Sequence, residues 1–532
     1  MSPTADIHLS ICQPLGSPHW LGLLDQARYY RWMFRRLGAN VTIAKNRLRH
    51  GAINFVFGAH DGFNPAAAER HACVFVNLEQ LGEGGRQMHP SFIELLRRSA
   101  VVDYDAGNLA AYAADPADVP VAPILYAPYL TPANPIPLEE RPIDLLFIGS
   151  MNERRKAWLD RIEACGLTVA MFDGALYSAE RDAYIVQAKA VVNAHYYESC
   201  RFEQARVSHC LSLGTPVISE RTPLTNPHEA FEDSVLWLQG GELEQFFSED
   251  FGTPAYYEAM YAALERFRAH DPIEAYADVL GFARGFAGER AKQIDTGAWR
   301  PTLINLGSGK DYQAGWLNLD IVERTQPDLL LDLAEPIELP LRASTPTQGE
   351  LLLEEGSVEL INANNVLEHV PDLVTLMGNC LKLLAPGGEF RIEVPYEHAR
   401  SAWQDPTHVR AFNENSWSYY TDWFWYLGWY EHRFEIADSS YLDERVQPCE
   451  QGQAAFMRLT LRKIETTPAE RMHAQAMQPE VRLPEDDVRP LSSVRPELVE
   501  GQRCAQGFDK LSPNGIQSLS PNGIRSTQCE AA

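Results

Sequence analysis

The chain has 532 residues, about three times the usual size of a single domain, so several hydrophobic cores are expected. Its 46 Lys and Arg against 72 Asp and Glu give a formal net charge of -26. That sign argues against nucleic acid or anionic lipid as the main partner. No apolar run reaches the roughly 20 residues that span a bilayer, and the first residues lack the pattern of a secretory signal. We therefore expect a cytoplasmic protein without an integral membrane segment.

The nine cysteines are scattered, and no two of them form a C-x-x-C pair. This distribution argues against a disulfide framework and against a structural zinc site.

Residues 1–135 are predicted to form a first Rossmann-like lobe. Apolar residues recur at helical spacing from Trp20 to Leu37, and Gly38 follows as a stop signal. Short apolar runs typical of buried parallel strands alternate with such stretches, which predicts βαβ units. The expected strands are 7–11, 41–44, 53–58, 73–78 and 100–104.

Residues 140–292 are predicted to form a second Rossmann-like lobe after a proline-rich linker at 128–142. The expected strands are 144–149, 167–172, 188–195 and 215–220. The expected helices are 154–165 and 202–213, with a helical tail over 257–284.

Residues 300–464 are predicted to form a third α/β domain. Its last two strands have no helix between them, which predicts an antiparallel hairpin at a sheet edge. The expected strands are 303–306, 316–321, 328–333, 358–364, 389–395, 433–442 and 455–464. After residue 465 the chain has one aromatic residue, Phe508, and two copies of a short repeat, LSPNGIQS and LSPNGIRS. Such a segment has too little apolar surface to fold, so disorder is predicted for residues 465–532.

A glycine turn, Gly307-Ser308-Gly309, follows the first strand of the third domain. A turn without bulky side chains lets a cofactor approach the backbone closely. The next strand ends at Asp320, whose carboxylate can accept hydrogen bonds from ribose hydroxyls. A third strand ends at Asp332, where an adenine ring would lie. The spacing therefore predicts a site for a nucleoside-containing cofactor.

Residues 303–321, 364–372, 383–395 and the DPTHVRAFNENSW segment at 405–417 resemble the class I S-adenosylmethionine-dependent methyltransferases found among bacterial surface-polysaccharide genes. The resemblance implies a mostly parallel seven-stranded sheet and S-adenosylmethionine as cofactor. It implies a cofactor site formed by Gly307, Ser308 and Gly309 at the methionine end, Asp320 at the ribose, Asp332 and Leu333 at the adenine, and Asn364 and Asn365 beside the methyl donor.

His369 and His408 are the candidate bases for removing a proton from an acceptor hydroxyl, because a histidine titrates near neutral pH. Asp405 could orient His408 or bind a sugar hydroxyl, and Arg410 is a candidate for substrate binding. In the alternative interpretation, Glu368 and His369 cap the next helix, and His408 with Arg410 ties down a loop.

Residues 77–84, 101–108, 144–159 and 191–220 resemble two-lobed (GT-B-like) bacterial glycosyltransferases. The resemblance implies a cleft between the lobes and a nucleotide sugar as possible co-substrate. Gly149 and Ser150 precede a helix start where phosphate could bind. The candidate substrate-binding residues are Arg154, Arg155, Glu203, Arg206 and Glu220. The family usually has a glutamate five residues before the glycine at Gly214, where this chain has His209, which leaves open that this half has lost activity.

Three further features have two interpretations each. Asp103 and Asp105 could hold a metal, but a role in a loop or cap is favoured, and no metal site is predicted. His60 and Asp61 could approach an acceptor sugar or cap a helix. The aromatic run from Trp417 to Tyr430 could stack on sugars, but a buried cap over the sheet is favoured.

The leading hypothesis is a bifunctional enzyme of bacterial glycan assembly, in which sugar transfer is followed by methylation of a glycan or small-molecule acceptor. Alternatively, the N-terminal half is a non-catalytic module that binds a glycan or a nucleotide sugar. A third possibility is that both halves are degenerate scaffolds without activity. The intact set of residues from Gly307 to Asp320 argues against this possibility. A dinucleotide oxidoreductase is disfavoured because the glycine turn lacks the full G-x-G-x-x-G pattern.

Overall fold

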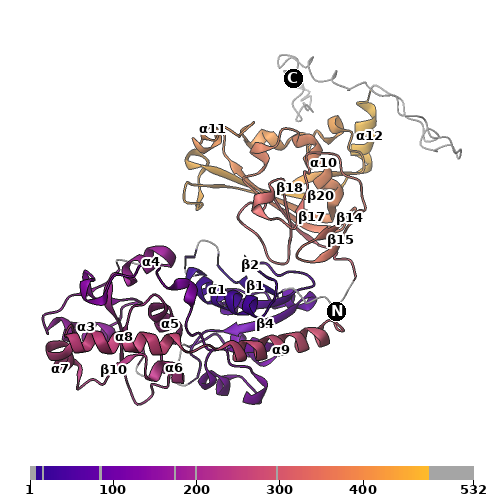
Figure 1. Cartoon of the computed structure of the whole chain (residues 1–532). Helices are drawn as coiled ribbons and strands as arrows, with labels where there is room; N and C mark the ends of the chain where they lie inside the picture. The colour runs from indigo at the N-terminus through magenta and orange to yellow at the C-terminus, as the bar shows by residue number, and fades with distance from the viewer. Residues whose placement is uncertain are drawn as a thin grey trace. The chain divides into compact units, whose positions relative to one another are not determined.

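The structure is a computed structural model, and it describes residues 7–14, 17–18, 20–82, 87–172, 175–197, 200–294 and 297–478. Three β-sheets with helices beside them make up most of this α/β chain (Figure 1). Residues 479–532, which form most of the predicted disordered tail, lie outside the described residues. No helix in the described part of the chain combines the length and hydropathy that crossing a membrane requires.

The first sheet has five parallel strands in the order β2-β1-β3-β4-β5. The expected strands are all confirmed: β1 (Ile7–Ile11), β2 (Val41–Lys45), β3 (Ile53–Phe57), β4 (Ala72–Asn77) and β5 (Ala100–Asp103). Every residue of β1, β3 and β4 is buried, as expected for parallel strands covered on both faces. The helices of this lobe are α1 (Trp20–Arg36) and α2 (Pro90–Arg97).

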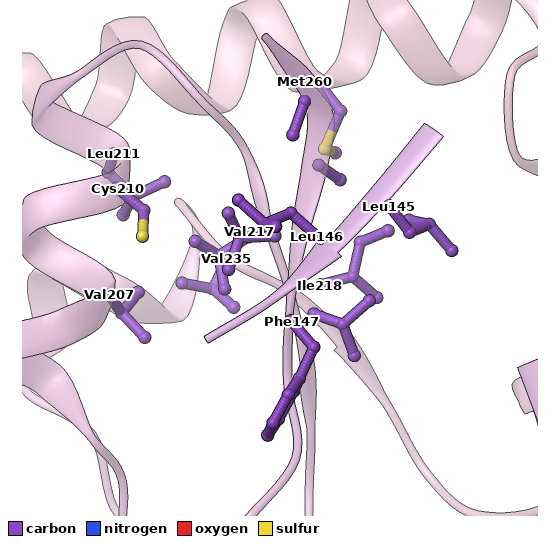
Figure 2. Packing of buried hydrophobic residues seen from close by; sticks show 14 of the residues in the cluster. Leu145, Leu146, Phe147, Val207, Cys210, Leu211, Val217, Ile218, Val235 and Met260 are labelled. Atoms are coloured by element: carbon purple, nitrogen blue, oxygen red, sulfur yellow. The ribbon is translucent and has the colours of Figure 1, made fainter. Parts of the chain in front are cut away.

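The second sheet is also five-stranded and parallel, in the order β10-β9-β8-β6-β7. Its strands are β6 (Ile143–Phe147), β7 (Val169–Ala170), β8 (Ala188–Asn193), β9 (Val217–Glu220) and β10 (Leu236–Leu238). Its helices are α3 (Glu153–Glu163), α4 (Ser178–Ile185), α5 (Gln204–Ser212), α6 (Glu229–Glu232), α7 (Leu243–Gln245) and α8 (Pro254–Arg268). Figure 2 shows Leu146 and Val217 of the sheet on the side of Val207 and Cys210 of α5, whereas Ile218 lies on the opposite side.

Helix α9 (Ile273–Arg290) follows the second sheet in sequence but packs against the first (Figure 1). Tyr276, Val279, Leu280 and Ala283 are buried in the same core as β1, β3 and α1. The Tyr276 ring lies 5.0 Å from the Tyr30 ring, edge to face, a favourable aromatic geometry. The core of the first lobe is therefore completed by residues far along the chain.

The third sheet is mixed, in the order β13-β12-β11-β16-β17-β20-β18-β19. Strand β20 is antiparallel to both of its neighbours, β17 and β18. The neighbouring pairs from β13 through β12, β11 and β16 to β17 are parallel. The bounds are β11 (Leu303–Leu306), β12 (Leu317–Asp320), β13 (Leu329–Leu330), β16 (Val358–Asn364), β17 (Leu384–Pro395), β18 (His432–Leu442), β19 (Pro448–Cys449) and β20 (Phe456–Glu465). The mostly parallel sheet is confirmed, with β19 as an additional two-residue eighth strand. The predicted hairpin of β18 and β20 is present, but β20 lies inside the sheet rather than at its edge.

A separate hairpin, β14 (Leu341–Thr345) and β15 (Gly349–Leu353), and helix α10 (Leu373–Leu383) complete this domain. Leu376, Met377 and Cys380 of α10 are buried in the core that the sheet shares with Trp417 and Tyr420. The helix therefore presents the apolar face that its spacing predicts.

Helix α12 (Pro468–Ala476) corrects the expectation that disorder begins at residue 465. Ala474 is fully buried against Phe424 and Trp425. Thr467 and Glu470 form reciprocal hydrogen bonds at the helix start, with Thr467 N donating to Glu470 at 2.7 Å and Glu470 N donating to Thr467 Oγ1 at 3.2 Å. This pairing is the capping box that a Thr-x-x-Glu spacing predicts, and the sequence interpretation missed it.

Candidate functional site

The glycine turn after β11 requires residues without side chains. Gly307 has a φ of +62° and Gly309 a φ of +49°, values in the left-handed region that favours glycine. A Cβ atom on Gly307 would overlap the Val366 side chain. The Ser308 N–H donates to the Leu319 carbonyl at 2.9 Å. The turn is thus held close to the end of β12.

Asp320 connects this turn to the strand ends around it. Its Oδ2 accepts a hydrogen bond from Gly309 N at 2.7 Å, and its Oδ1 accepts one from Val322 N at 2.8 Å. The residue is 8% exposed. Each carboxylate oxygen has a second lone pair, so Asp320 can accept further hydrogen bonds from a ligand hydroxyl while it holds the turn.

Ser308 adds an unsatisfied group to the same turn. Its side-chain oxygen is buried and has no hydrogen-bond partner among the described residues. Buried polar groups in folded proteins nearly always have a partner. A polar ligand seated on the turn would supply one.

The other predicted cofactor residues lie at neighbouring strand ends. Asp332 is exposed, and its Oδ1 accepts a hydrogen bond from Ala334 N at 2.8 Å. Leu333 is 1% exposed and its side chain lies in the core, so only its backbone could face a ligand. Asn364 and Asn365 are exposed at the end of β16, and their side chains are joined by a 2.7 Å hydrogen bond.

His369 and His408 lie next to each other, although 39 positions separate them in numbering from 369 to 408. Their ring centroids are 4.7 Å apart, edge to face. His369 ends the short helix η9 (Leu367–His369), and His408 follows helix α11 (Ser401–Gln404). The Val409 N–H donates to the Glu368 carbonyl at 2.8 Å, which joins the two segments. The structure therefore brings together the two histidines that the sequence nominated as bases.

Hydrogen bonds at Nδ1 define the tautomer of both neutral rings. The Thr407 hydroxyl donates to Asp405 Oδ1 at 2.6 Å, so its oxygen accepts from His369 Nδ1–H at 2.9 Å. His408 Nδ1–H donates to the Ala402 carbonyl at 3.0 Å. In this arrangement the Nε2 atom of each neutral ring keeps its lone pair.

Asp405 is held in its ionised form. Hydrogen bonds from the Thr407 hydroxyl and the Thr407 N–H keep the pKa of Asp405 below its ordinary value. It acts on His369 through Thr407, whereas the sequence interpretation placed it beside His408. An ionised carboxylate at the end of this chain favours the Nδ1–H form of His369.

Glu368 is 1% exposed, and neither of its carboxylate oxygens has a hydrogen-bond partner among the described residues. Burial raises the pKa of Glu368 to about 7. The alternative interpretation that Glu368 and His369 cap the next helix is wrong, because Asp372 caps α10 by accepting a hydrogen bond from Thr375 N at 3.0 Å. The spacing of Asp372 and Thr375 was the available signal.

Arg410 lies on the chain segment that follows His408. Its Nη2 donates to the Val370 and Pro371 carbonyls at 2.7 and 2.6 Å. These contacts tie the segment to the end of η9, as the structural alternative expected. The two carbonyls thus accept hydrogen bonds from a charged guanidinium group close to His369 and His408.

The aromatic run forms largely a buried cap. Trp417, Tyr420, Phe424 and Trp425 are buried, and the Trp417 ring stacks on Phe412 at 5.2 Å. Tyr419 and Tyr426 are exposed in the same run. Trp423, Trp429 and Tyr430 are partly exposed, so five aromatic side chains of the run keep some accessible surface.

A second candidate site is a cleft of about 1070 Å³ that is lined by residues from both the first and the second sheet regions. Gly149 and Ser150 line it, followed by the start of α3, where Asn152 Oδ1 accepts a hydrogen bond from Arg155 N at 2.9 Å. Gly149 has a φ of +142°, and a Cβ there would lie 2.7 Å from Arg206 Nη1. Two arginines thus approach the turn before α3.

Glu203 lies at the centre of the charges in this cleft. Its carboxylate lies 3.2 Å from Arg155, 3.3 Å from Arg206 and 2.9 Å from His195 Nδ1. Burial opposes its ionisation, but the hydrogen bond from His195 and the arginine charges outweigh burial, so the pKa of Glu203 is about 2. Glu203 therefore orients the two arginines as a permanent anion.

The remaining predicted residues of this half divide between the cleft and its surroundings. Arg154 and Glu220 form a bidentate ion pair at 2.7 and 2.5 Å and are not among the residues that line the cleft. His209, His60 and Asp61 do line it. Sequence reasoning missed His195, and the signal was its position two residues after the end of the buried strand β8.

The Asp103 and Asp105 pair has the expected structural role. Asp105 caps the short helix η3 (Ala106–Ala111) through Gly107 N at 2.7 Å. Asp103 is fully buried and accepts hydrogen bonds from Asn77, Asn108 and Tyr112. Burial raises the pKa of Asp103 to about 6.

No family model matches the chain, and no curated protein matches it. Solved structures are similar to parts of it. An S-adenosylmethionine-dependent methyltransferase from Mesorhizobium loti is 14% identical, covers 32% of this chain and 94% of its own, and has a TM-score of 0.21. Burkholderia thailandensis 1,6-didemethyltoxoflavin-N1-methyltransferase is 17% identical over 31% of this chain and 72% of its own, with a TM-score of 0.21. Anabaena Alr3699/HepE in complex with UDP-glucose is 13% identical over 52% of this chain and 99% of its own, with a TM-score of 0.35.

Proposed function

We propose that residues 300–464 bind S-adenosylmethionine and transfer its methyl group to a hydroxyl of a glycan or related small-molecule acceptor. The observation that carries the proposal is Asp320, which holds the glycine turn through Gly309 and keeps free lone pairs at the ends of β11 and β12. Ser308 contributes a buried hydroxyl without a partner among the described residues. This set of residues fits a cofactor that carries a ribose and a charged amino-acid group.

S-adenosylmethionine supplies an electrophilic methyl group on a positively charged sulfur. The chain's own contribution is to orient the acceptor and to remove its proton. We assign that proton to Nε2 of His369 or His408, because the Nδ1 atoms of both rings are engaged by Thr407 and Ala402. The acceptor oxygen then bonds to the methyl carbon as the carbon–sulfur bond breaks.

We propose further that residues 1–292 bind a nucleotide sugar in the cleft between their lobes and belong with the methyltransferase domain in bacterial glycan assembly. Arg155 and Arg206 at the turn before α3 support this, because guanidinium groups near a helix start suit a diphosphate. Two activities in one chain would keep the sugar product near the second site and raise its effective concentration.

A second candidate is that the N-terminal half binds a glycan or a nucleotide sugar without turnover. The engagement of Glu203 by Arg155, Arg206 and His195 favours it, because a carboxylate whose charge is already compensated is less available to a ligand. His209 also stands where the two-lobed enzymes have a glutamate, and its Nε2 lies 2.8 Å from Asp182.

The test is calorimetric titration of the full chain with S-adenosylmethionine and then with UDP-, GDP- and dTDP-sugars. Saturable binding of both classes, followed by release of the nucleoside diphosphate, supports the bifunctional enzyme. Nucleotide-sugar binding without release supports the binding module. A folded chain that does not bind S-adenosylmethionine would contradict the methyltransferase proposal.

A matched pair of variants locates the nucleotide-sugar site. Arg206→Met removes a guanidinium that lines the cleft. Arg221→Met removes one that forms an exposed ion pair with Glu232 at 2.8 Å. We expect at least tenfold weaker nucleotide-sugar binding from the first and no change from the second. Equal affinities would place the ligand elsewhere.

A further inference from the structure

We propose that Glu368, His369 and His408 bind one divalent transition-metal ion. One ligand atom from each of the three side chains lies within 4.8 Å of the other two. Ligands bound to a single ion at about 2.0 to 2.2 Å lie roughly 3 to 3.5 Å apart. Small rotations of the two histidine rings, which are both only partly buried, would bring the three atoms to that separation.

The hydrogen bonds of the two rings prepare them for a metal. His408 Nδ1–H donates to the Ala402 carbonyl, and His369 Nδ1–H donates to Thr407, which in turn donates to Asp405. Metal-binding histidines usually make this kind of bond with the ring nitrogen that does not hold the ion. In both rings Nε2 therefore carries the free lone pair.

Glu368 supplies the independent observation that points to a ligand. Its carboxylate is buried, and neither oxygen has a hydrogen-bond partner among the described residues. Burial of a carboxylate without a partner is unfavourable. A cation coordinated by Glu368 would remove this cost, and its position within 4.8 Å of both histidine ligand atoms places the cation between the three groups.

The donor set indicates the class of metal. Two imidazole nitrogens and one carboxylate oxygen suit Zn²⁺, Mn²⁺, Fe²⁺ or Co²⁺. Mg²⁺ and Ca²⁺ prefer sites built from oxygen ligands. Three protein ligands leave at least one coordination position for another group, and the partial exposure of His369 and His408 leaves that position accessible.

The role of the ion rests on the proposed methyl transfer, whereas its binding does not. A hydroxyl oxygen of the acceptor would occupy the open position, where the ion lowers the hydroxyl pKa. The proton leaves to water, and the oxygen bonds to the methyl carbon as the carbon–sulfur bond breaks. Nε2 atoms that hold an ion cannot also accept this proton, so the ion would replace the histidines as the activating group.

Binding is tested on the untagged full chain after treatment with a chelator and dialysis. Titration with Co²⁺, followed by visible absorption, reports coordination directly, and calorimetry with Zn²⁺ and Mn²⁺ gives stoichiometry. We expect one ion per chain, and at least thirtyfold weaker binding in Glu368→Gln and in His408→Gln. His398→Gln is the control, because His398 lies in the same domain with a side chain that is 77% exposed, and it should bind like the parent protein.

Thermal unfolding of each variant shows whether it is folded, and His369→Gln replaces any variant that is not. Absence of saturable binding below about 1 mM in the folded parent chain, or equal binding by the parent and by Glu368→Gln, His369→Gln and His408→Gln, would overturn the proposal. Failure of S-adenosylmethionine to bind in parallel titrations would instead count against the proposed function, with the metal result unaffected.

Discussion

Asp320 accepts a hydrogen bond from the backbone N–H of Gly309 at 2.7 Å, although eleven positions separate them in the chain. The bond joins the end of β12 to the turn after β11, which are neighbours in the sheet. A carboxylate in this position both shapes the turn and offers lone pairs to a ligand. Its loss should therefore affect ligand binding more than a surface carboxylate would.

Asp320→Ala is expected to weaken S-adenosylmethionine binding at least tenfold. The change removes the acceptor for Gly309 N and Val322 N and the proposed contact to the ribose hydroxyls. Calorimetric titration measures the effect. Asp438→Ala, at an exposed position on β18, is the control, and similar affinities in the two variants would remove Asp320 from the site.

Gly307→Ala is expected to destabilise the chain by about 2 kcal/mol or more, because it combines a left-handed backbone with overlap of Val366. Gly387→Ala tests the backbone alone, since Gly387 has a φ of +80° and a Cβ there would meet no atom within 4 Å. Chemical unfolding of both variants separates the two effects. Adding Val366→Ala to Gly307→Ala should restore part of the loss, and no restoration would contradict the overlap.

Stability of the metal-free protein should fall as the pH rises toward and through 7. The pKa of Glu368 is raised from its ordinary 4.5 to about 7, so the folded state binds this proton more tightly than the unfolded state does. The stabilisation that protonated Glu368 provides is then fully present below pH 4.5 and is lost progressively as the pH rises to about 7.

Glu368→Gln should abolish that contribution and make the metal-free protein more stable at pH 8 by about 2 kcal/mol. Urea unfolding at pH 5.5 and pH 8 with a chelator present measures it. An identical difference between the two pH values in the parent and the variant would show that another group is responsible.

Removal of residues 466–478 should lower the melting temperature, because it deletes α12 and its buried Ala474. Arg433 would also lose its 2.6 Å ion pair with Glu470. Two truncated chains that end at Glu465 and at Gln478 make the comparison, and scanning calorimetry measures it. We expect a decrease of about 2 to 8 °C, and equal melting temperatures would mean that α12 contributes nothing.

The sheets were predictable because parallel strands covered on both faces leave continuous apolar runs, as in β1, β3 and β4. Strand β13 lies within the expected strand 328–333, whereas β10 was not predicted because its three residues are too few to show a period. Helix α12 is itself rich in polar residues, and its buried residue Ala474 packs against Phe424 and Trp425. The spacing of Thr467 and Glu470 marks the start of the helix, but the packing that stabilises it is a tertiary effect.

Some features of the candidate sites could be predicted from the sequence, and others arise only when the chain folds. The glycine turn and Asp320 were found because their roles depend on backbone geometry that the sequence marks directly. The sequence placed His369 and His408 at the same edge of the sheet but could not give the distance between them. Their 4.7 Å ring separation, and the buried Glu368 carboxylate without a hydrogen-bond partner among the described residues, depend on how two loops fold together. The ion pair of Arg154 with Glu220 is likewise a product of folding that residue types alone do not specify.

The packing of α9 has a consequence for synthesis on the ribosome. The first lobe's strands are complete at Asp103, but the core they enclose takes Tyr276, Val279, Leu280 and Ala283 from a helix that ends at Arg290. From Asp103 to Arg290 the ribosome adds nearly 190 residues. Until then, the apolar side of the first sheet that α9 will cover stays exposed in the nascent chain. At typical rates of about 5 to 20 residues per second, that interval lasts on the order of ten to forty seconds.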